Sequence, residues 1–204
     1  MKYSGPGTIA SFNWDTSASS VSSSQAHLSS QYYDICIRRA RSYCSVCYSP
    51  GITSTTAASS YGLSAGGYAP ATAAASGSLC TGKTTLSTTA TSNTGFGDYL
   101  DILALQPGTG SSGALGAAGT SVNRICGTVF NVLAHAATVT APATACSWVV
   151  PFKVGVHFDA DEALVAAPPA PTANYNAAEN YPLVTGGGGY AYSGFYLNYW
   201  QNSC

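Results

Sequence analysis

Apolar and polar side chains alternate over residues 152–158, where every second position from Phe152 to Phe158 is apolar. A period of two is the pattern of a β-strand that buries one of its faces. His157 falls among the other positions of this run and is expected to face outward. Residues 194–201, close to the end of the chain, alternate in the same way. Both segments are therefore predicted to be core strands.

Shorter runs of the same kind predict further strands at residues 8–12, 32–38, 43–48 and 98–105, with residues 86–94 as an additional candidate. The runs at 32–38 and 43–48 are expected to form the two arms of a hairpin. Connections rich in Ser, Thr, Ala and Gly separate the strands, and no segment predicts a helix of ordinary length. Many short strands with Gly- and Pro-rich connections predict an all-β sandwich with long loop insertions. We expect residues 1–204 to form a single domain.

The charge content is unusually low for a soluble protein. Only 7% of the residues are charged and the net charge is −1, whereas about 25% of an average soluble domain is charged. No overall field would attract nucleic acid or an anionic membrane. No apolar run approaches the roughly 18 residues that a membrane span needs. The expected partners are therefore proteins or other copies of this chain.

Seven cysteines in this Ser- and Thr-rich chain are typical of an oxidising compartment and favour disulfides. Cys44 and Cys47 form one CxxC, but no second CxxC or nearby histidine completes a zinc site. Because seven is odd, at least one thiol is free, pairs between chains, or has lost its partner. The N-terminal residues do not form a signal peptide, so we expect a secreted, extracellular protein whose secretion signal lies elsewhere.

Several segments, taken in order, resemble a CUB domain, and in particular the divergent CUB domains of secreted arthropod proteins. They read GTIASFN, QYYDICIRRARSYCSV, CTG, GDYLDI, RICGTVF, PFKVGVHFDAD and GFYLNYWQNSC, and they span nearly the whole chain. The resemblance implies a jelly-roll-like sandwich of two antiparallel sheets. It also implies a disulfide between Cys126 and Cys146. The further pairs expected with it are Cys36 with Cys44 and Cys80 with Cys204, which leaves Cys47 unpaired or intermolecular.

The resemblance also implies a calcium site, because many CUB domains bind calcium at one end of the sandwich. Asp98 and Asp161 match two aspartates of that site, and Asp159 and Glu162 lie close to the second in sequence. Calcium prefers six to eight oxygen ligands. The glutamate that the family supplies is missing, because residues 45–49 contain no carboxylate. The alternative is that the two aspartates cap loops or pair with an arginine.

Three arginines, Arg38, Arg39 and Arg41, lie close together at the junction of the expected hairpin. They would project from one end of it. Such a group is either a solvated turn or a contact for an anion or an acidic partner.

Catalysis finds little support in the sequence. Residues 77–84 fit the pattern GxxxxGK[ST] of a phosphate-binding loop, but no hydrophobic strand precedes them and no helix-forming segment follows. We interpret the match as chance. His27 and His135 are expected in loops, and no GxSxG nucleophile motif occurs. We predict that the chain is not an enzyme and needs no cofactor apart from the calcium considered above.

Two functions fit these observations. The first is a secreted, non-catalytic protein-interaction module, whose 14 tyrosines offer large contact areas at low entropic cost. The second is a structural component that self-assembles into an extracellular fibre, coat or matrix. Low charge favours the second, because weakly charged surfaces do not repel their copies.

Overall fold

The computed structural model describes residues 5–12, 14, 27–52, 60–63, 74–76, 80, 98–108, 121–127, 129–132, 142–159 and 194–204. These residues form ten strands and no helix. The strands are β1 (Gly7–Ala10), β2 (Gln31–Ile37), β3 (Tyr43–Pro50), β4 (Tyr61–Gly62), β5 (Ala74–Ser76), β6 (Tyr99–Pro107), β7 (Val122–Gly127), β8 (Ala145–Ser147), β9 (Phe152–Phe158) and β10 (Gly194–Ser203). The all-β prediction is therefore confirmed. The long insertions lie mostly outside the described residues, as does the candidate strand at 86–94.

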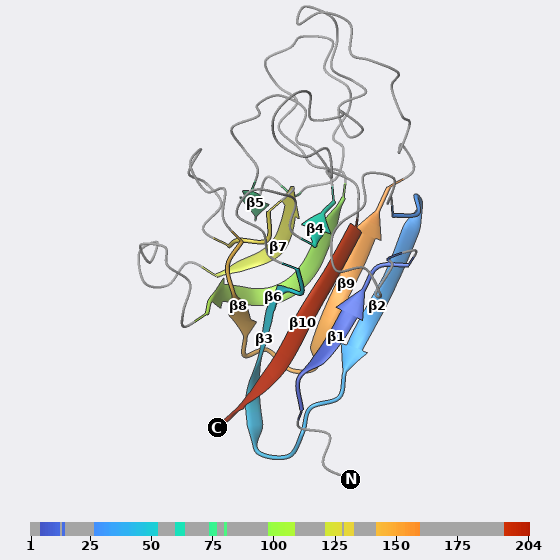
Figure 1. Cartoon of the computed structure of the whole chain (residues 1–204). Helices are drawn as coiled ribbons and strands as arrows, with labels where there is room; N and C mark the ends of the chain where they lie inside the picture. Colours follow the sequence, from blue (N-terminus) through green and yellow to red (C-terminus); the bar gives the residue numbers. More distant parts are fainter. Residues whose placement is uncertain are drawn as a thin grey trace, which may run out of the picture.

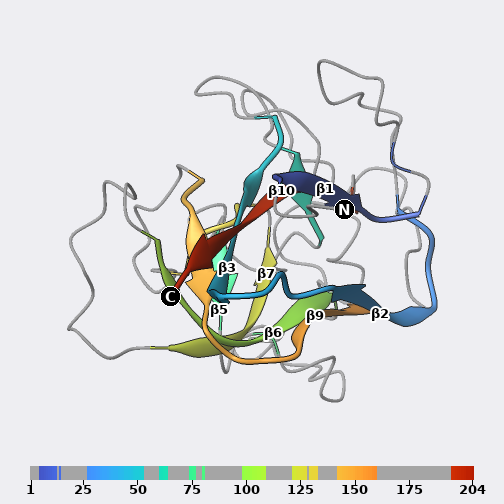
Figure 2. The same ribbon diagram turned by 90° about the horizontal axis from the view of Figure 1, so that it is seen from below.

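The strands form two facing antiparallel layers (Figure 1). One layer has the order β1-β10-β3-β8, with the short β4 paired to the start of β10. The other has the order β2-β9-β6-β7-β5. Seen from below, β1 and β10 lie on one side of the molecule, and β2, β9 and β6 lie on the other (Figure 2).

Strand β6 belongs to both layers. Its first residues pair with β9 and β7, whereas Gln106 and Pro107 pair with β8. The register shifts between Asp101 and Leu105, where Ala104 has a φ of 50°. An irregularity of this kind bends a strand and increases its twist. The two sheets are thus joined along one side, and the sandwich is partly closed like a barrel.

The core lies between the layers and is built from the alternating positions of the long strands. Strand β9 buries Phe152, Val154, Val156 and Phe158, as the sequence pattern predicts. Strand β10 buries Phe195 and Leu197 against them from the opposite layer. Side chains of β3 and β6, including Tyr48, Leu100 and Ile102, complete the same cluster. Each layer therefore buries the face that is turned toward the other layer.

The predicted hairpin of residues 32–38 and 43–48 is wrong. Strand β2 pairs with β9 along its whole length, whereas β3 lies in the other layer between β10 and β8. The connection between β2 and β3 crosses from one layer to the other. The side chain of Gln201 on β10 pins this crossing, because it accepts a hydrogen bond from the Ala40 N–H (2.8 Å) and donates one to the Arg38 carbonyl (2.9 Å).

Gly194 opens β10 with a φ of 83°, a conformation that disfavours any residue with a Cβ. A Cβ at this position would also collide with the Ser11 hydroxyl, which accepts a hydrogen bond from the Phe195 N–H (3.1 Å). We expect Gly194→Ala to lower the free energy of unfolding by about 1–3 kcal/mol, as measured by urea denaturation. Gly5→Ala is the matched control, because a Cβ there meets nothing within 4 Å. Equal stability of the two variants would contradict this account of Gly194.

Candidate functional site

Asp98 is a buried carboxylate directly before β6. Its Oδ1 accepts a hydrogen bond from the Asp159 N–H (2.8 Å), directly after the end of β9. The Nε2 of His27 lies 3.3 Å from the other carboxylate oxygen and 3.0 Å from the Leu63 carbonyl oxygen. Burial raises the pKa of the Asp98 carboxyl, and the hydrogen bonds from His27 and the Asp159 backbone oppose that shift. Asp98 therefore joins the ends of two core strands. This is the loop-capping role that the sequence offers as the alternative to calcium binding.

The predicted calcium ligands are only partly placed by the structure. Asp98 faces protein donors and is 0% exposed, while Asp161 and Glu162 lie outside the described residues. Within the described ranges, no three side chains of His, Cys, Asp or Glu come together to hold a metal ion. Calcium prefers six to eight oxygens, so Asp98 and Asp159 do not make a site by themselves. Calcium binding by Asp98 and Asp161 stays a prediction.

Calcium binding is tested by thermal unfolding in millimolar calcium and in excess chelator. A ligand that binds only the folded state stabilises it by about 2.7 kcal/mol at a concentration one hundred times its Kd. If Asp98 and Asp161 bind calcium, Tm should therefore rise with calcium and fall back with chelator. Magnesium at the same concentration is the control for ionic strength. A Tm that is the same in calcium and in chelator contradicts the prediction.

The three arginines lie on the crossing between β2 and β3, not at a hairpin turn. Arg38, Arg39 and Arg41 are exposed. Within the described part of the chain they form no ion pair. This environment fits the solvated-turn interpretation, and contact with an anion or an acidic partner stays a prediction.

The cysteine pairs predicted from the resemblance are wrong. The structure joins Cys44 to Cys204, Cys47 to Cys146 and Cys80 to Cys126, and leaves Cys36 as an exposed free thiol. Cys36 cannot reach Cys44 because β2 and β3 lie in different layers. Cys47 and Cys146 are directly opposed on β3 and β8, with their Cα atoms 4.0 Å apart. Cys204 directly follows β10, whose last residue Ser203 pairs with Tyr43 at the start of β3, next to Cys44.

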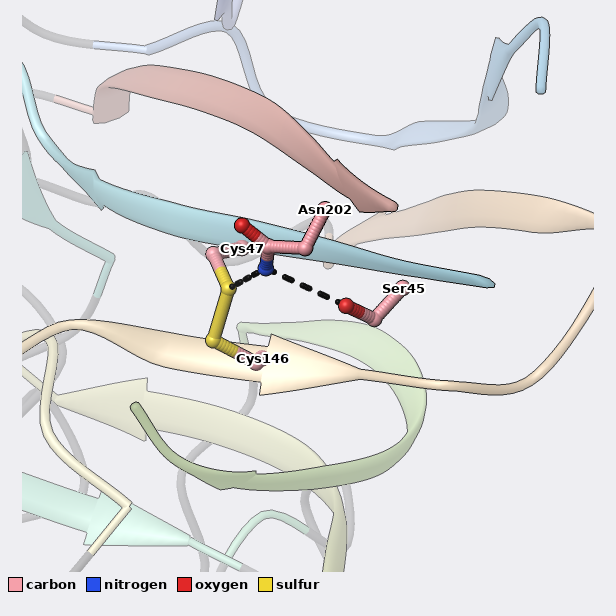
Figure 3. Close-up of a disulfide and its surroundings, with 4 residues drawn as sticks. All are labelled: Ser45, Cys47, Cys146 and Asn202. Atoms are coloured by element: carbon pink, nitrogen blue, oxygen red, sulfur yellow. Dashed lines mark hydrogen bonds between the residues drawn. A yellow bond between two sulfur atoms is a disulfide. The ribbon is translucent and has the colours of Figure 1, made fainter. Parts of the chain in front are cut away.

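The Cys47–Cys146 disulfide is covered by a polar side chain. Figure 3 shows the Asn202 amide from β10 pointing to the Cys47 sulfur and to the Ser45 hydroxyl, both at 3.1 Å. Cys47 and Cys146 are 3% and 4% exposed. A disulfide with so little exposure is shielded from external thiols, which indicates a structural role for it.

The match to a phosphate-binding loop likewise contains a buried structural cysteine, Cys80, with the rest of that motif outside the described residues.

Cys36 is expected to be the one thiol that reacts under native conditions. It is exposed on β2, whereas the other six cysteines are held in disulfides. Titration of the folded protein with a thiol reagent should find about one sulfhydryl per chain, and Cys36→Ser should find none. Labelling retained by the Cys36→Ser variant, or no labelling of the monomeric wild-type chain, would contradict the assignment.

An aromatic row crosses the outer face of the β2-β9-β6 sheet. Tyr32 on β2, His157 on β9 and Tyr99 on β6 are register partners in neighbouring strands. The Tyr32 ring meets the His157 ring edge-on, and the Tyr99 ring stacks on the His157 ring. The ring centroids are 4.4 Å apart in both pairs. The Arg124 guanidinium lies over the Tyr99 ring, 4.6 Å from its centroid. Partial burial lowers the pKa of His157.

The next row on the same face carries charges. Gly155 on β9 lies between Asp34 on β2 and Asp101 on β6. Lys153, two residues earlier on β9, lies 3.3 Å from Oδ2 of Asp34. The outward position of His157 agrees with the sequence pattern, but the sequence did not indicate its aromatic neighbours. Only the pairing of β2 and β6 with β9 brings these side chains together.

The described chain contains no helix long and apolar enough to cross a membrane.

A model of the animal CUB domain family matches residues 3–202. No curated protein and no solved structure shows significant similarity to the chain. The family match covers almost the whole sequence and agrees with the antiparallel sandwich and its three disulfides. CUB domains in general mediate protein interactions and are non-catalytic, and the disulfide-bonded animal ones are typically extracellular. The chain belongs to the animal CUB domain family.

Proposed function

We propose that residues 1–204 form a single secreted, non-catalytic protein-interaction domain that binds its partner through the outer face of the β2-β9-β6 sheet. The observation that supports this most directly is the aromatic row. Tyr32 is 80% exposed although it is a large, partly apolar side chain. Tyrosine and arginine are enriched where proteins bind each other, because they bury a large area and still offer polar groups.

The sheet geometry supports the same surface. Core residues of β9 hold the other side of the strand in place, so the outward residues are fixed on a rigid element. Rigid aromatic side chains lose little entropy on binding. The relation to secreted arthropod CUB domains would be consistent with this role and stays a prediction.

The test compares partner capture by the folded wild-type protein and by two variants. Wild type, Tyr32→Ser and the control Trp148→Ser are immobilised and exposed to extracellular fluid of the source tissue. Trp148 is the control because it is also large and exposed (52%) but follows β8 in the other layer. We expect the wild type and the Trp148 variant to retain the same partner. The Tyr32 variant should retain at least tenfold less of that partner, as for the loss of a central aromatic contact. Equal retention by the Tyr32 variant would contradict the proposed surface.

The alternative is a self-assembling extracellular component. The exposed Cys36 thiol favours it, because an unpaired cysteine in an oxidising compartment is available to bridge two copies. Non-reducing electrophoresis of the secreted protein distinguishes the two. A dimer that disappears on reduction and in Cys36→Ser would support assembly, whereas a monomer supports the interaction module.

A further inference from the structure

Strand β2 is an open edge of its layer, where it lies beside β9 (Figure 1). All seven of its residues pair with β9, and no strand among the described residues lies along its other side. Successive residues of an antiparallel strand point their backbone N–H and C=O groups to opposite sides, so about half of these groups on β2 face away from β9. Only Ile37 of this strand is buried. The outer side of β2 therefore carries backbone donors and acceptors for a further strand.

Strand β2 lacks the features with which proteins protect an exposed edge. Such edges are commonly very short, bulged, or interrupted by proline or lysine. The other edge strands described, β1, β4 and β5, have only four, two and three residues. In contrast, β2 has seven residues, contains neither proline nor lysine, and keeps one register with β9 from end to end. A strand of this length and regularity is a template for the addition of another strand.

The two ends of the β2 edge differ in chemistry. Exposed apolar and aromatic side chains gather at its start, where Leu28 precedes the strand and Tyr32 is its second residue. The exposed ring of Phe12 packs there on the Tyr33 ring, with centroids 4.9 Å apart. The three exposed arginines follow the other end of β2 and form no ion pair within the described part of the chain. One end thus complements apolar side chains, and the other complements carboxylates.

We propose that an extended segment of the protein partner, acidic at its N-terminal end, pairs with the outer side of β2 as an added antiparallel strand. This inference rests on the proposed function of the β2-β9-β6 face, which the added strand would extend beside Tyr32. Every strand pair described in this chain is antiparallel. The N-terminal end of an antiparallel partner meets the end of β2, where the arginines lie. Backbone hydrogen bonds supply affinity in this binding mode, and side chains supply specificity.

An acidic partner fits this edge better than a second copy of the chain. If two β2 strands paired antiparallel along their whole length, the arginines of each copy would meet residues at and before the start of the other β2. Residues 27–33 contain no carboxylate. Both arginine groups would therefore lack a charged partner, whereas a foreign segment with glutamate or aspartate at this end neutralises one group directly.

Amide hydrogen exchange of the ¹⁵N-labelled full chain tests whether the edge is open. In the free protein we expect the amides at alternate positions of β2 to exchange readily, because they lack a backbone partner, and the others to be protected by β9. Protection of every β2 amide in the free chain would show that the edge is already occupied and would overturn the proposal. Exchange that slows as the protein concentration rises would identify a second copy as the occupant and would overturn it as well.

The binding probe is the N-acetylated peptide Glu-Glu-Val-Thr-Val-Thr-Val-Thr. At saturation we expect it to slow exchange of the open β2 amides at least tenfold, because each gains a backbone hydrogen bond. A peptide that leaves these amides unprotected would overturn the proposal.

Two N-methylated forms of the peptide distinguish strand addition from binding by side chains alone. Methylation of every second residue removes the amide donors on one side of the peptide strand. One alternating set should weaken binding at least tenfold and the other should change it little, because only one side of the added strand faces β2. Equal binding by the two forms would overturn strand addition.

The acidic end is tested by removing charge from each side. A peptide with Gln-Gln in place of Glu-Glu, and the triple variant Arg38→Gln/Arg39→Gln/Arg41→Gln, should each weaken binding about tenfold. The two changes together should cost little more than one, because they remove the same contacts. Undiminished binding after either change would overturn the acidic partner. If the peptides fail but partner capture still depends on Tyr32, only this inference is wrong and the proposed function stands.

Discussion

Replacing Phe195 by alanine is expected to lower the free energy of unfolding by about 3–5 kcal/mol. Phe195 is 0% exposed on β10, and its ring meets Phe158 from the opposite layer with centroids 6.5 Å apart. Alanine would lose the buried area and leave a cavity where the two sheets meet. Urea denaturation followed by circular dichroism measures the change.

The matched control for Phe195→Ala is Trp148→Ala, which removes an even larger ring from an exposed position. We expect that control to lose less than about 1 kcal/mol, because exposed substitutions change stability little. A loss for Trp148→Ala as large as that for Phe195→Ala would contradict the two-layer core, since it would place the main apolar contacts elsewhere.

The second large effect is expected from removing the Cys47–Cys146 disulfide. The double variant Cys47→Ala/Cys146→Ala should lose about 2–5 kcal/mol of unfolding free energy. The bridge joins β3 to β8 across a sequence separation of 99 residues, so its removal frees a long loop in the unfolded chain. The Asn202 amide would also lose its contact with the Cys47 sulfur.

Cys36→Ser is the control for the disulfide variant, because Cys36 is exposed and unbridged. It should unfold at the same urea concentration as the wild type. Peptide mapping without reductant gives an independent check and should recover Cys47 linked to Cys146. A Cys36–Cys44 or Cys126–Cys146 peptide instead would restore the pairing predicted from the resemblance and contradict the structure.

The sequence predicts those parts of the fold that depend on local periodicity. Residues 152–158 form β9 over the predicted positions, and the alternating run near the C-terminus forms β10. Each buries one face, so a period of two is visible without knowing which strand lies alongside. The pairing between strands is not visible in this way. Strands β2 and β9 are more than one hundred residues apart, yet they pair along seven positions.

The hairpin error and the wrong Cys36–Cys44 pair have the same cause. Two short strands separated by an arginine-rich segment are typical of a hairpin, but Gln201 on β10 holds that segment as a crossing between layers. Once β2 and β3 are separated, Cys36 loses its expected partner. Cys44 then lies beside Cys204, and Cys47 opposite Cys146. Pairing of cysteines follows strand order, which local sequence does not specify.

The sequence predicts single residues of the candidate site but not which residues lie together. The alternation places His157 on the outer face, but Tyr32, Tyr99 and Asp101 join it through the registers of β2 and β6 with β9. Asp98 was expected as a calcium ligand, and that role stays a prediction. Its burial and its bond to the Asp159 N–H make it a link between strand ends, a role that depends on the tertiary fold.

We propose that the domain binds a different protein as a monomer, and light scattering over a hundredfold range of concentration distinguishes this from self-assembly. The Cys36→Ser variant is measured beside the wild type, so that adventitious disulfides do not affect the result. We predict the mass of one 204-residue chain at every concentration. A mass that rises with concentration in both proteins would contradict the claim and favour a self-assembling component.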